Sequence, residues 1–287
     1  MLYLSRFTFP DAEWETGFLM GILRKCYDTF YPFKVLSSRG LEEVEFEPIT
    51  LFYGGNGSGK TTALNVIAEK LRLQRDSRYN RSSFFEDYTD ACRYELRTEV
   101  PAESRAITSD DVFDFMLNLR TLNQGIDEKR EDLFQEYMDA KYSDFHFRTM
   151  EDYDRLKTVN LSRRSTQSRY VRKKLMDNLP EHSNGESAFY YFTQRIQENA
   201  LYLLDEPENS LSPERQLELT RFLEDSARFF GCQFIIATHS PFLLSLKGAK
   251  VYDLDADPAA VRRWTDLPAV RAYYDFFQAH AGEFQRP

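Results

Sequence analysis

The chain has 287 residues, of which 42% are hydrophobic and 29% are charged, which is ordinary for a globular protein and enough for one large α/β domain. Its formal net charge of -9 excludes broad electrostatic binding of nucleic acid over the whole surface, while local basic patches stay compatible with it. Three widely spaced cysteines and the lack of any apolar stretch of membrane-spanning length predict a reduced, cytoplasmic protein that does not insert into a membrane.

The first fifty residues show short apolar runs that predict strands around one helix. The expected strands are Tyr3–Phe9, Phe33–Leu36 and Val44–Phe46, and the expected helix is Thr16–Cys26. A further apolar run, Ile49–Tyr53, predicts a buried strand directly before a glycine-rich segment.

That glycine-rich segment fits the P-loop pattern G-x-x-x-x-G-K-[ST] in full. The candidate nucleotide-binding residues are Gly54, Gly55, Asn56, Gly57, Ser58, Gly59, Lys60, Thr61 and Thr62. Glycines let the backbone wrap closely around a polyphosphate, and its N–H groups face the anion together with the start of a helix expected over Thr62–Leu71. Lys60 adds a charge near the β- and γ-phosphates, and Thr61 offers a hydroxyl to Mg²⁺. The segment therefore predicts ATP and Mg²⁺ as ligands, against the alternative of a glycine-rich turn before a helix.

Residues 75–180 are polar, charged and mostly helical in pattern, without a sustained heptad repeat. Within them, Leu161–Met176 carries six basic residues and no acidic one. This cluster fits a contact with nucleic-acid phosphates, a contact with the nucleotide of a partner subunit, or a solvated helix face. For DNA, the solvated face is slightly favoured.

A second candidate anion site opens the helical pattern Ser187–Asn199. The segment Ser183-Asn184-Gly185-Glu186 places small polar residues at the start of that helix, where backbone N–H groups are free to bind an anion. The alternative is an ordinary helix cap at Ser183 or Asn184.

Two apolar runs further along the chain end in polar residues that suit phosphate chemistry. Leu201–Leu204 runs into Asp205 and Glu206, where Asp205 would hold Mg²⁺ and Glu206 would polarise the attacking water. The alternative is a strand with an acidic turn. The run Ile235–Ala237 leads to His239, placed to orient that water beside the γ-phosphate.

The last part of the chain shows three simple patterns. They predict an amphipathic helix over Glu214–Phe229, a final strand over Val251–Leu254 and a closing helix over Val270–Phe284.

Taken in order, these motifs resemble those of the ABC-type ATPases. Gly54–Thr62 is similar to Walker A, Ser183–Glu186 to the signature motif, Leu201–Glu206 to Walker B with its catalytic glutamate, and His239 to the switch histidine. Ser210-Leu211-Ser212 falls where the D-loop lies. One departure is the lack of a convincing Q-loop glutamine, for which Ser109 or Asp110 is the nearest substitute.

The resemblance points to one branch of that family. Glu186 at the last signature position and Thr238-His239-Ser240-Pro241 are typical of the SMC, RecF and OLD branch, whereas transporter ATPases usually carry Gln at the signature position. The resemblance is to a small single-domain ATPase without a coiled-coil arm. Residues 240–287 are also too few for the C-terminal nuclease domain of OLD-type proteins.

The fold that the resemblance implies is an α/β P-loop NTPase of ABC type. We expect one domain, residues 1–287, with a mixed central sheet and an N-terminal antiparallel subdomain. Its catalytic lobe would cover about residues 1–74 and 200–287, and an inserted helical lobe about residues 75–199.

The function that the resemblance implies is Mg²⁺-dependent ATP hydrolysis. Lys60, Glu206 and His239 would be catalytic, Thr61 and Asp205 would hold the metal, and Ser183, Gly185 and Glu186 would complete the ATP site of a second copy in an ATP-dependent homodimer. The chain would then be a motor or switch subunit working with DNA or an effector such as a nuclease, in genome maintenance or defence against mobile elements. The alternatives are the ATPase subunit of a transporter and a non-hydrolysing nucleotide-binding module.

Overall fold

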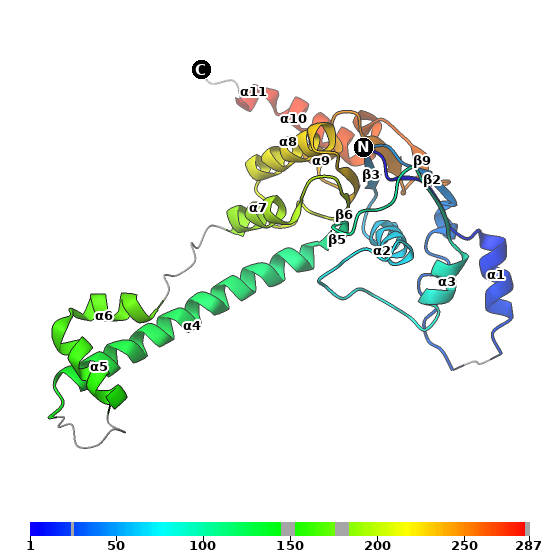
Figure 1. The fold of residues 1–287 in the computed structure, drawn as a ribbon. Coiled ribbons are helices and arrows are strands. Elements are labelled where there is room, and N and C mark those ends of the chain that lie inside the picture. The colour runs from blue at the N-terminus through cyan, green and yellow to red at the C-terminus, as the bar shows by residue number, and fades with distance from the viewer. Residues whose placement is uncertain (24–25, 145–152, 176–183, 285–287) are drawn as a thin grey trace. The chain divides into compact units, whose positions relative to one another are not determined.

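The computed structural model describes residues 1–23, 26–144, 153–175 and 184–284. The chain divides into two compact units, shown in Figure 1. The large unit consists of Met1–Phe113 and Asn184–Pro287, and the small unit of Asp114–Ser183.

A six-stranded sheet forms the centre of the large unit. Its order is β5-β6-β7-β3-β8-β9, and every neighbouring pair is parallel except β8 and β9. The strands are β3 (Ile49–Tyr53), β5 (Arg105–Thr108), β6 (Leu201–Asp205), β7 (Gln233–Ala237), β8 (Lys250–Asp253) and β9 (Ala260–Val261). Strands β3 and β7 are buried along their whole length, which explains their nearly continuous apolar sequences. The predicted mixed α/β sheet is confirmed.

The register of the sheet brings the ends of several strands to one edge. Asp205 is paired with Ala237 on one side and with Thr108 on the other, and Ala237 is paired with Phe52 of β3. Because the carboxyl ends of parallel strands are where ligands bind, the residues after β3, β6 and β7 share the edge suited to a ligand.

A second, three-stranded sheet has the order β2-β1-β4 and is antiparallel, which confirms the predicted N-terminal subdomain. Its strands are β1 (Leu4–Thr8), β2 (Glu43–Glu45) and β4 (Arg93–Leu96). Strand β4 lies within residues 75–180, a segment whose pattern predicts mostly helix.

The expected strand at Phe33–Leu36 is wrong. These residues form turns that lead into a 3₁₀ helix, Ser37–Arg39, and Phe33 and Leu36 are buried without joining a sheet. The carboxylate of buried Glu15 holds this segment by accepting hydrogen bonds from the Lys34 backbone N–H at 2.6 Å and the Ser37 hydroxyl at 2.8 Å. Burial of its side chains, rather than strand pairing, explains the apolar run.

The helices of the large unit follow the predicted patterns with shifted ends. They are α1 (Ala12–Met20), α2 (Lys60–Lys70), α3 (Phe85–Ala91), α7 (Asn184–Arg195), α8 (Pro213–Phe229), α9 (Pro241–Leu244), α10 (Pro268–Ala279) and α11 (Ala281–Phe284). Helix α1 begins before Thr16, because the Asp11 carboxylate caps it by accepting the Trp14 N–H. The strand expected to be final is followed by β9, and the closing helix is divided into α10 and α11.

The small unit has its own core. Helix α4 (Ser109–Lys141) runs from the large unit into it, and α5 (Tyr153–Arg164) and α6 (Gln167–Lys174) follow. Tyr170 and Val171 of α6 pack with Leu133 and Tyr137 of α4. The small unit is shorter than the expected helical lobe, since β4, β5 and α7 belong to the large unit. Among the described residues, no helix combines the length and the apolarity that crossing a membrane requires.

Candidate nucleotide site

The P-loop joins β3 to α2, as the sequence pattern predicts. Gly59 ends the loop with φ +98°, a left-handed conformation that disfavours any side chain. A Cβ atom at Gly59 would also lie 3.0 Å from the Leu36 Cδ2 atom, so the loop packs closely on the buried turn of the N-terminal segment. Glycine is therefore needed at Gly59 for two separate reasons.

Lys60 lies at the start of α2 and is buried, with only 4% of its surface exposed. Its Nζ atom donates hydrogen bonds to the carbonyl oxygens of Gly54 at 2.7 Å and Gly55 at 3.1 Å. The same atom lies 3.7 Å from the Glu206 carboxylate. Asn56 to Thr62 and Glu206 line a cavity of about 190 Å³ at this point.

A hydroxyl and a carboxylate meet beside Lys60. The Thr61 hydroxyl donates a hydrogen bond to the Asp205 carboxylate at 3.1 Å. Burial raises the pKa of Asp205 to about 6, the Thr61 hydrogen bond opposes this shift, and the nearby Glu206 charge adds to it. Two oxygen ligands in a poorly hydrated place fit a hard cation such as Mg²⁺, whose charge would offset the burial of Asp205.

Glu206 directly follows β6 in a left-handed backbone conformation, with φ +47°. Its N–H donates to the Ala237 carbonyl at 2.9 Å, so the strained residue is held from the neighbouring strand. Its Oε1 atom lies 3.6 Å from Nδ1 of His239, and its Oε2 accepts a hydrogen bond from the Asn209 amide at 3.0 Å. Such strain is common at functional positions, because it points a side chain in a direction that ordinary backbone geometry does not provide.

The second predicted anion site is only partly described. Ser183 lies outside the described residues. Gly185 and Glu186 belong to α7, where a Cβ at Gly185 would lie 3.5 Å from the Ser210 carbonyl, and Glu186 pairs with Arg215 at 3.0 Å. These two residues therefore lie against α8 and the segment before it, and they are not among the residues that line the P-loop cavity.

For the Q-loop position the sequence offers Ser109 or Asp110. Ser109 and Asp110 form the first residues of α4, next to Thr108, which is paired with Asp205. Asp111 accepts hydrogen bonds from the N–H of Thr108 at 2.7 Å and from its hydroxyl at 3.0 Å, so this segment is a capped helix start at the ligand edge of the sheet.

Two residues near the site were missed by the sequence reasoning. One is Asp255, whose carboxylate accepts from the Gly55 N–H at 2.8 Å, and the other is Glu208, next to His239. Tyr31, an aromatic residue upstream of the P-loop, donates from its hydroxyl to Thr62 Oγ1 at 3.2 Å. Asp255 follows β8, which lies beside β3, and this neighbour relation follows from strand order rather than from any local motif.

The P-loop between β3 and α2, the acidic pair at the end of β6 and the histidine after β7 define a P-loop fold of the nucleoside-triphosphate-binding class. Residues 68–245, more than half of the chain, match the family model described as "AAA domain, putative AbiEii toxin, Type IV TA system". The chain belongs to that family. The matched stretch begins after the P-loop and contains Asp205, Glu206 and His239.

Several solved structures are similar to this chain at low identity. The Smc head domain from Pyrococcus furiosus, bound to the C-terminal domain of ScpA, is 15% identical, with 98% of this chain and 100% of that chain covered and a TM-score of 0.45. The SMC head domain from Thermotoga maritima is 12% identical, with 91% and 99% covered and a TM-score of 0.40. An inward-facing ABC transporter of metal-chelate type is 17% identical, with 83% and 82% covered and a TM-score of 0.37. Among curated proteins, no sequence matches this chain.

Proposed function

We propose that this protein binds Mg-ATP at the P-loop and hydrolyses it to ADP and phosphate. The observation that carries the proposal is the convergence of Lys60, Glu206 and His239, with Thr61 and Asp205 beside them, at the carboxyl edge of β3, β6 and β7. A cation, a hydroxyl–carboxylate pair for a metal and a carboxylate for water activation are the parts that phosphoryl transfer requires.

Each residue has a role that follows from its place. The P-loop N–H groups and Lys60 would bind the phosphates, with Lys60 exchanging its carbonyl partners for phosphate oxygens. Thr61 and Asp205 would hold Mg²⁺, which offsets the negative charge of the phosphates. Glu206 would accept the proton of the attacking water, and His239, 3.6 Å from Glu206, would orient that water.

The experiment that tests the activity is phosphate release by the purified chain with ATP and Mg²⁺. Wild type should turn over ATP, addition of a chelator should stop it, and Lys60→Ala should be inactive. If wild type binds ATP by calorimetry but releases no phosphate, the chain is the non-hydrolysing module instead. A cytoplasmic location is part of the proposal and can be checked by cell fractionation.

We propose further that two copies close around two ATP molecules. Gly185 and Glu186 lie against α8 and outside the lining of their own P-loop cavity, which supports a role toward a second copy. Light scattering of Glu206→Gln should show a twofold gain in mass only with Mg-ATP, since uncleaved ATP keeps the two copies together. Ser183→Arg should block this gain while leaving ATP binding intact. An unchanged mass, or dimerisation by Ser183→Arg, contradicts the arrangement.

The partner of the ATPase is proposed to be DNA or a DNA-acting effector. The observation that favours DNA is on α5 and α6, where Arg163, Arg164, Arg169, Arg172 and Lys173 are all exposed. Arg169, Arg172 and Lys173 are spaced to share one side of α6, and Tyr170 and Val171 are buried on the other. Within the described part of the chain, no acidic side chain pairs with these three cations.

Duplex DNA binding should therefore weaken steeply with salt and fall in a triple Arg169→Glu, Arg172→Glu, Lys173→Glu variant. The control is charge reversal at Arg221 and Arg228 of α8, which also makes the net charge more negative but leaves α6 unchanged. Equal binding by both variants would favour an effector protein, and a membrane permease as the neighbouring gene product would favour the transporter alternative.

A further inference from the structure

Glu208 is a buried carboxylate beside the proposed site, and one of its two oxygens accepts three hydrogen bonds. It lies two residues after Glu206, in the segment that joins β6 to α8, and 6% of its side chain is exposed. Ionised carboxylates are rarely buried without a reason, because loss of hydration is costly unless hydrogen bonds replace it.

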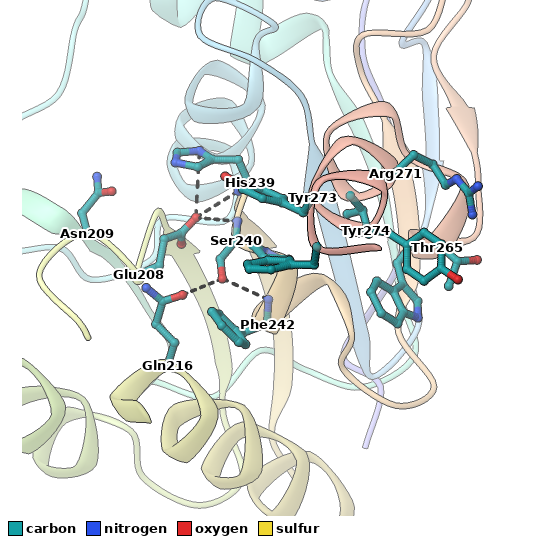
Figure 2. Close-up of a pocket in the computed structure, with 14 residues that line it drawn as sticks. Glu208, Asn209, Gln216, His239, Ser240, Phe242, Thr265, Arg271, Tyr273 and Tyr274 are labelled. Carbon is teal, nitrogen blue, oxygen red and sulfur yellow. Dashed lines mark hydrogen bonds and ion pairs between the residues drawn. The ribbon is translucent and has the colours of Figure 1, made fainter. Parts of the chain in front are cut away.

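The hydrogen bonds that the Glu208 carboxylate accepts from described residues come from one short segment, Thr238–Ser240. Figure 2 shows those from His239 and Ser240. Its Oε1 atom accepts from the Thr238 hydroxyl at 2.6 Å, the His239 N–H at 2.9 Å and the Ser240 N–H at 3.1 Å. The other oxygen, Oε2, is buried and has no hydrogen-bond partner among the described residues. The carboxylate thus binds the backbone N–H groups on both sides of the His239 side chain.

The far end of the same segment is also held. The Ser240 hydroxyl donates to the Gln216 side-chain oxygen at 2.6 Å and caps α9 by accepting from the Phe242 N–H at 3.2 Å. The His239 imidazole itself is 47% exposed and lies 3.6 Å from Glu206. The backbone beneath the imidazole is therefore fixed, while its ring faces the site.

We propose that Glu208 is a positioning residue that fixes the His239 imidazole against Glu206, an inference that rests on the proposed ATP hydrolysis. Glu208 and Glu206 belong to one short segment. By holding the backbone at His239, Glu208 therefore sets the distance between the Glu206 carboxylate and the His239 imidazole. In this proposal Glu208 acts through His239, whose backbone it holds, and not on ATP itself.

Kinetic variants test this role. Glu208→Ala should lower kcat by about 10²-fold, because small displacements of a catalytic group have effects of that size, with KM for ATP little changed since the P-loop is untouched. Glu208→Gln should retain most of the activity, since its amide oxygen can still accept from the same segment. The double variant Glu208→Ala, His239→Ala should be no slower than His239→Ala alone.

The matched control is Glu224→Ala. The Glu224 carboxylate accepts the Lys247 N–H at 2.9 Å, so it also anchors a loop to the large unit, but that loop carries none of the proposed catalytic residues. This control should keep the wild-type kcat. The proposal would be overturned if the losses of kcat from Glu208→Ala and His239→Ala multiplied in the double variant. It would also be overturned if Glu224→Ala lost as much kcat as Glu208→Ala.

Amide hydrogen exchange gives a readout that needs no hydrolysis. Exchange at His239 and Ser240 should become about 10- to 100-fold faster in Glu208→Ala, the factor expected for loss of a charge-assisted hydrogen bond, and should stay slow in Glu208→Gln and Glu224→Ala. Unchanged exchange in Glu208→Ala would overturn the anchoring. A wild-type chain without ATPase activity would overturn the proposed function alone, and exchange would still decide the role of Glu208.

Discussion

Asp205 shows how burial sets the chemistry of one residue in the proposed site. Its pKa is about 6, mainly because the folded protein removes water from the carboxylate. The charge of Glu206 adds to this shift, while the Thr61 hydroxyl and Lys60 favour ionisation. The carboxylate is therefore ionised for the most part at neutral pH, and its charge is sensitive to mild acid.

This leads to a prediction for metal binding. Below about pH 6 a proton occupies the Asp205 carboxyl, so Mg²⁺ must displace it and the apparent affinity for Mg²⁺ should fall as the pH decreases. Above about pH 7 the affinity should be level. The Mg²⁺ concentration that gives half-maximal phosphate release, measured from pH 5.5 to 7.5, checks this. Asp205→Asn should need more Mg²⁺ at every pH and lack the step near pH 6, and a step of equal size in that variant would contradict the assignment.

Lys60 is the residue whose loss should remove ATP binding. Its ammonium group is buried at the P-loop, and a phosphate charge there would lose its nearest cation in Lys60→Ala. Calorimetry should find ATP affinity abolished or strongly reduced. Arg72→Ala, which removes an exposed cation just beyond α2, is the control and should bind like wild type.

Glu206 separates binding from chemistry. Glu206→Gln keeps the side-chain shape but cannot accept the proton of water, so turnover should fall by about 10²-fold or more, as is usual for loss of a general base. ATP affinity should be retained. Rapid-quench measurement of a single turnover distinguishes slow cleavage from slow product release, and wild-type cleavage in this variant would show that another group is the base.

Sequence motifs predicted these residues because each belongs to a fixed pattern that follows or ends a buried strand. Glu208 has no such signal, since its partners Thr238 to Ser240 lie thirty residues further along and meet it only after β6 and β7 pair. Asp255 was missed for the same reason, as its contact with Gly55 depends on the pairing of β8 with β3.

At the scale of the element, the P-loop illustrates the difference between backbone strain and packing. Gly57 and Gly59 both have positive φ, +81° and +98°, but a Cβ atom would meet no other atom within 4 Å at Gly57 and would crowd Leu36 at Gly59. Gly57→Ala should thus cost about 1–2 kcal/mol of stability from strain alone. Gly59→Ala should cost more and should also weaken ATP binding, because the start of α2 must shift. Urea unfolding of both variants measures the difference, and equal losses would show that packing on Leu36 contributes nothing.

Periodicity predicted most helices and strands, and it failed where tertiary contacts determine the local structure. Strands β3, β6 and β7 and helix α8 follow from local pattern. The turns at Phe33–Leu36 do not, since Glu15 satisfies their polar groups from a distance in the sequence. Strand β4 was likewise missed. Its four residues are all exposed and mostly polar or charged, so they show no apolar pattern. Its place in the small sheet comes from pairing with β1.

At the scale of the whole molecule, burial sorts the three cysteines. Cys26 is exposed, whereas Cys92 and Cys232 are buried. Burial raises the pKa of Cys92 to about 12 and also raises the pKa of Cys232, so neither forms the reactive thiolate at neutral pH. Iodoacetamide should modify Cys26 alone in the folded chain and all three in urea, as mass spectrometry of tryptic peptides can show. Rapid native labelling of Cys92 would contradict this packing.

The alignment of β6 with its neighbours has a consequence for how the chain must fold. Its residues Leu201–Leu204 are all buried, so the apolar pattern does not distinguish one face of the strand from the other. A shift of one residue would turn Asp205 toward the opposite face and away from Thr61. Tyr202 opposes such a shift, because its hydroxyl accepts from the Gln197 N–H at 2.6 Å and donates to the Gln197 carbonyl at 3.1 Å. A single phenol at the start of the strand thus helps to specify the alignment in which Asp205 meets the Thr61 hydroxyl.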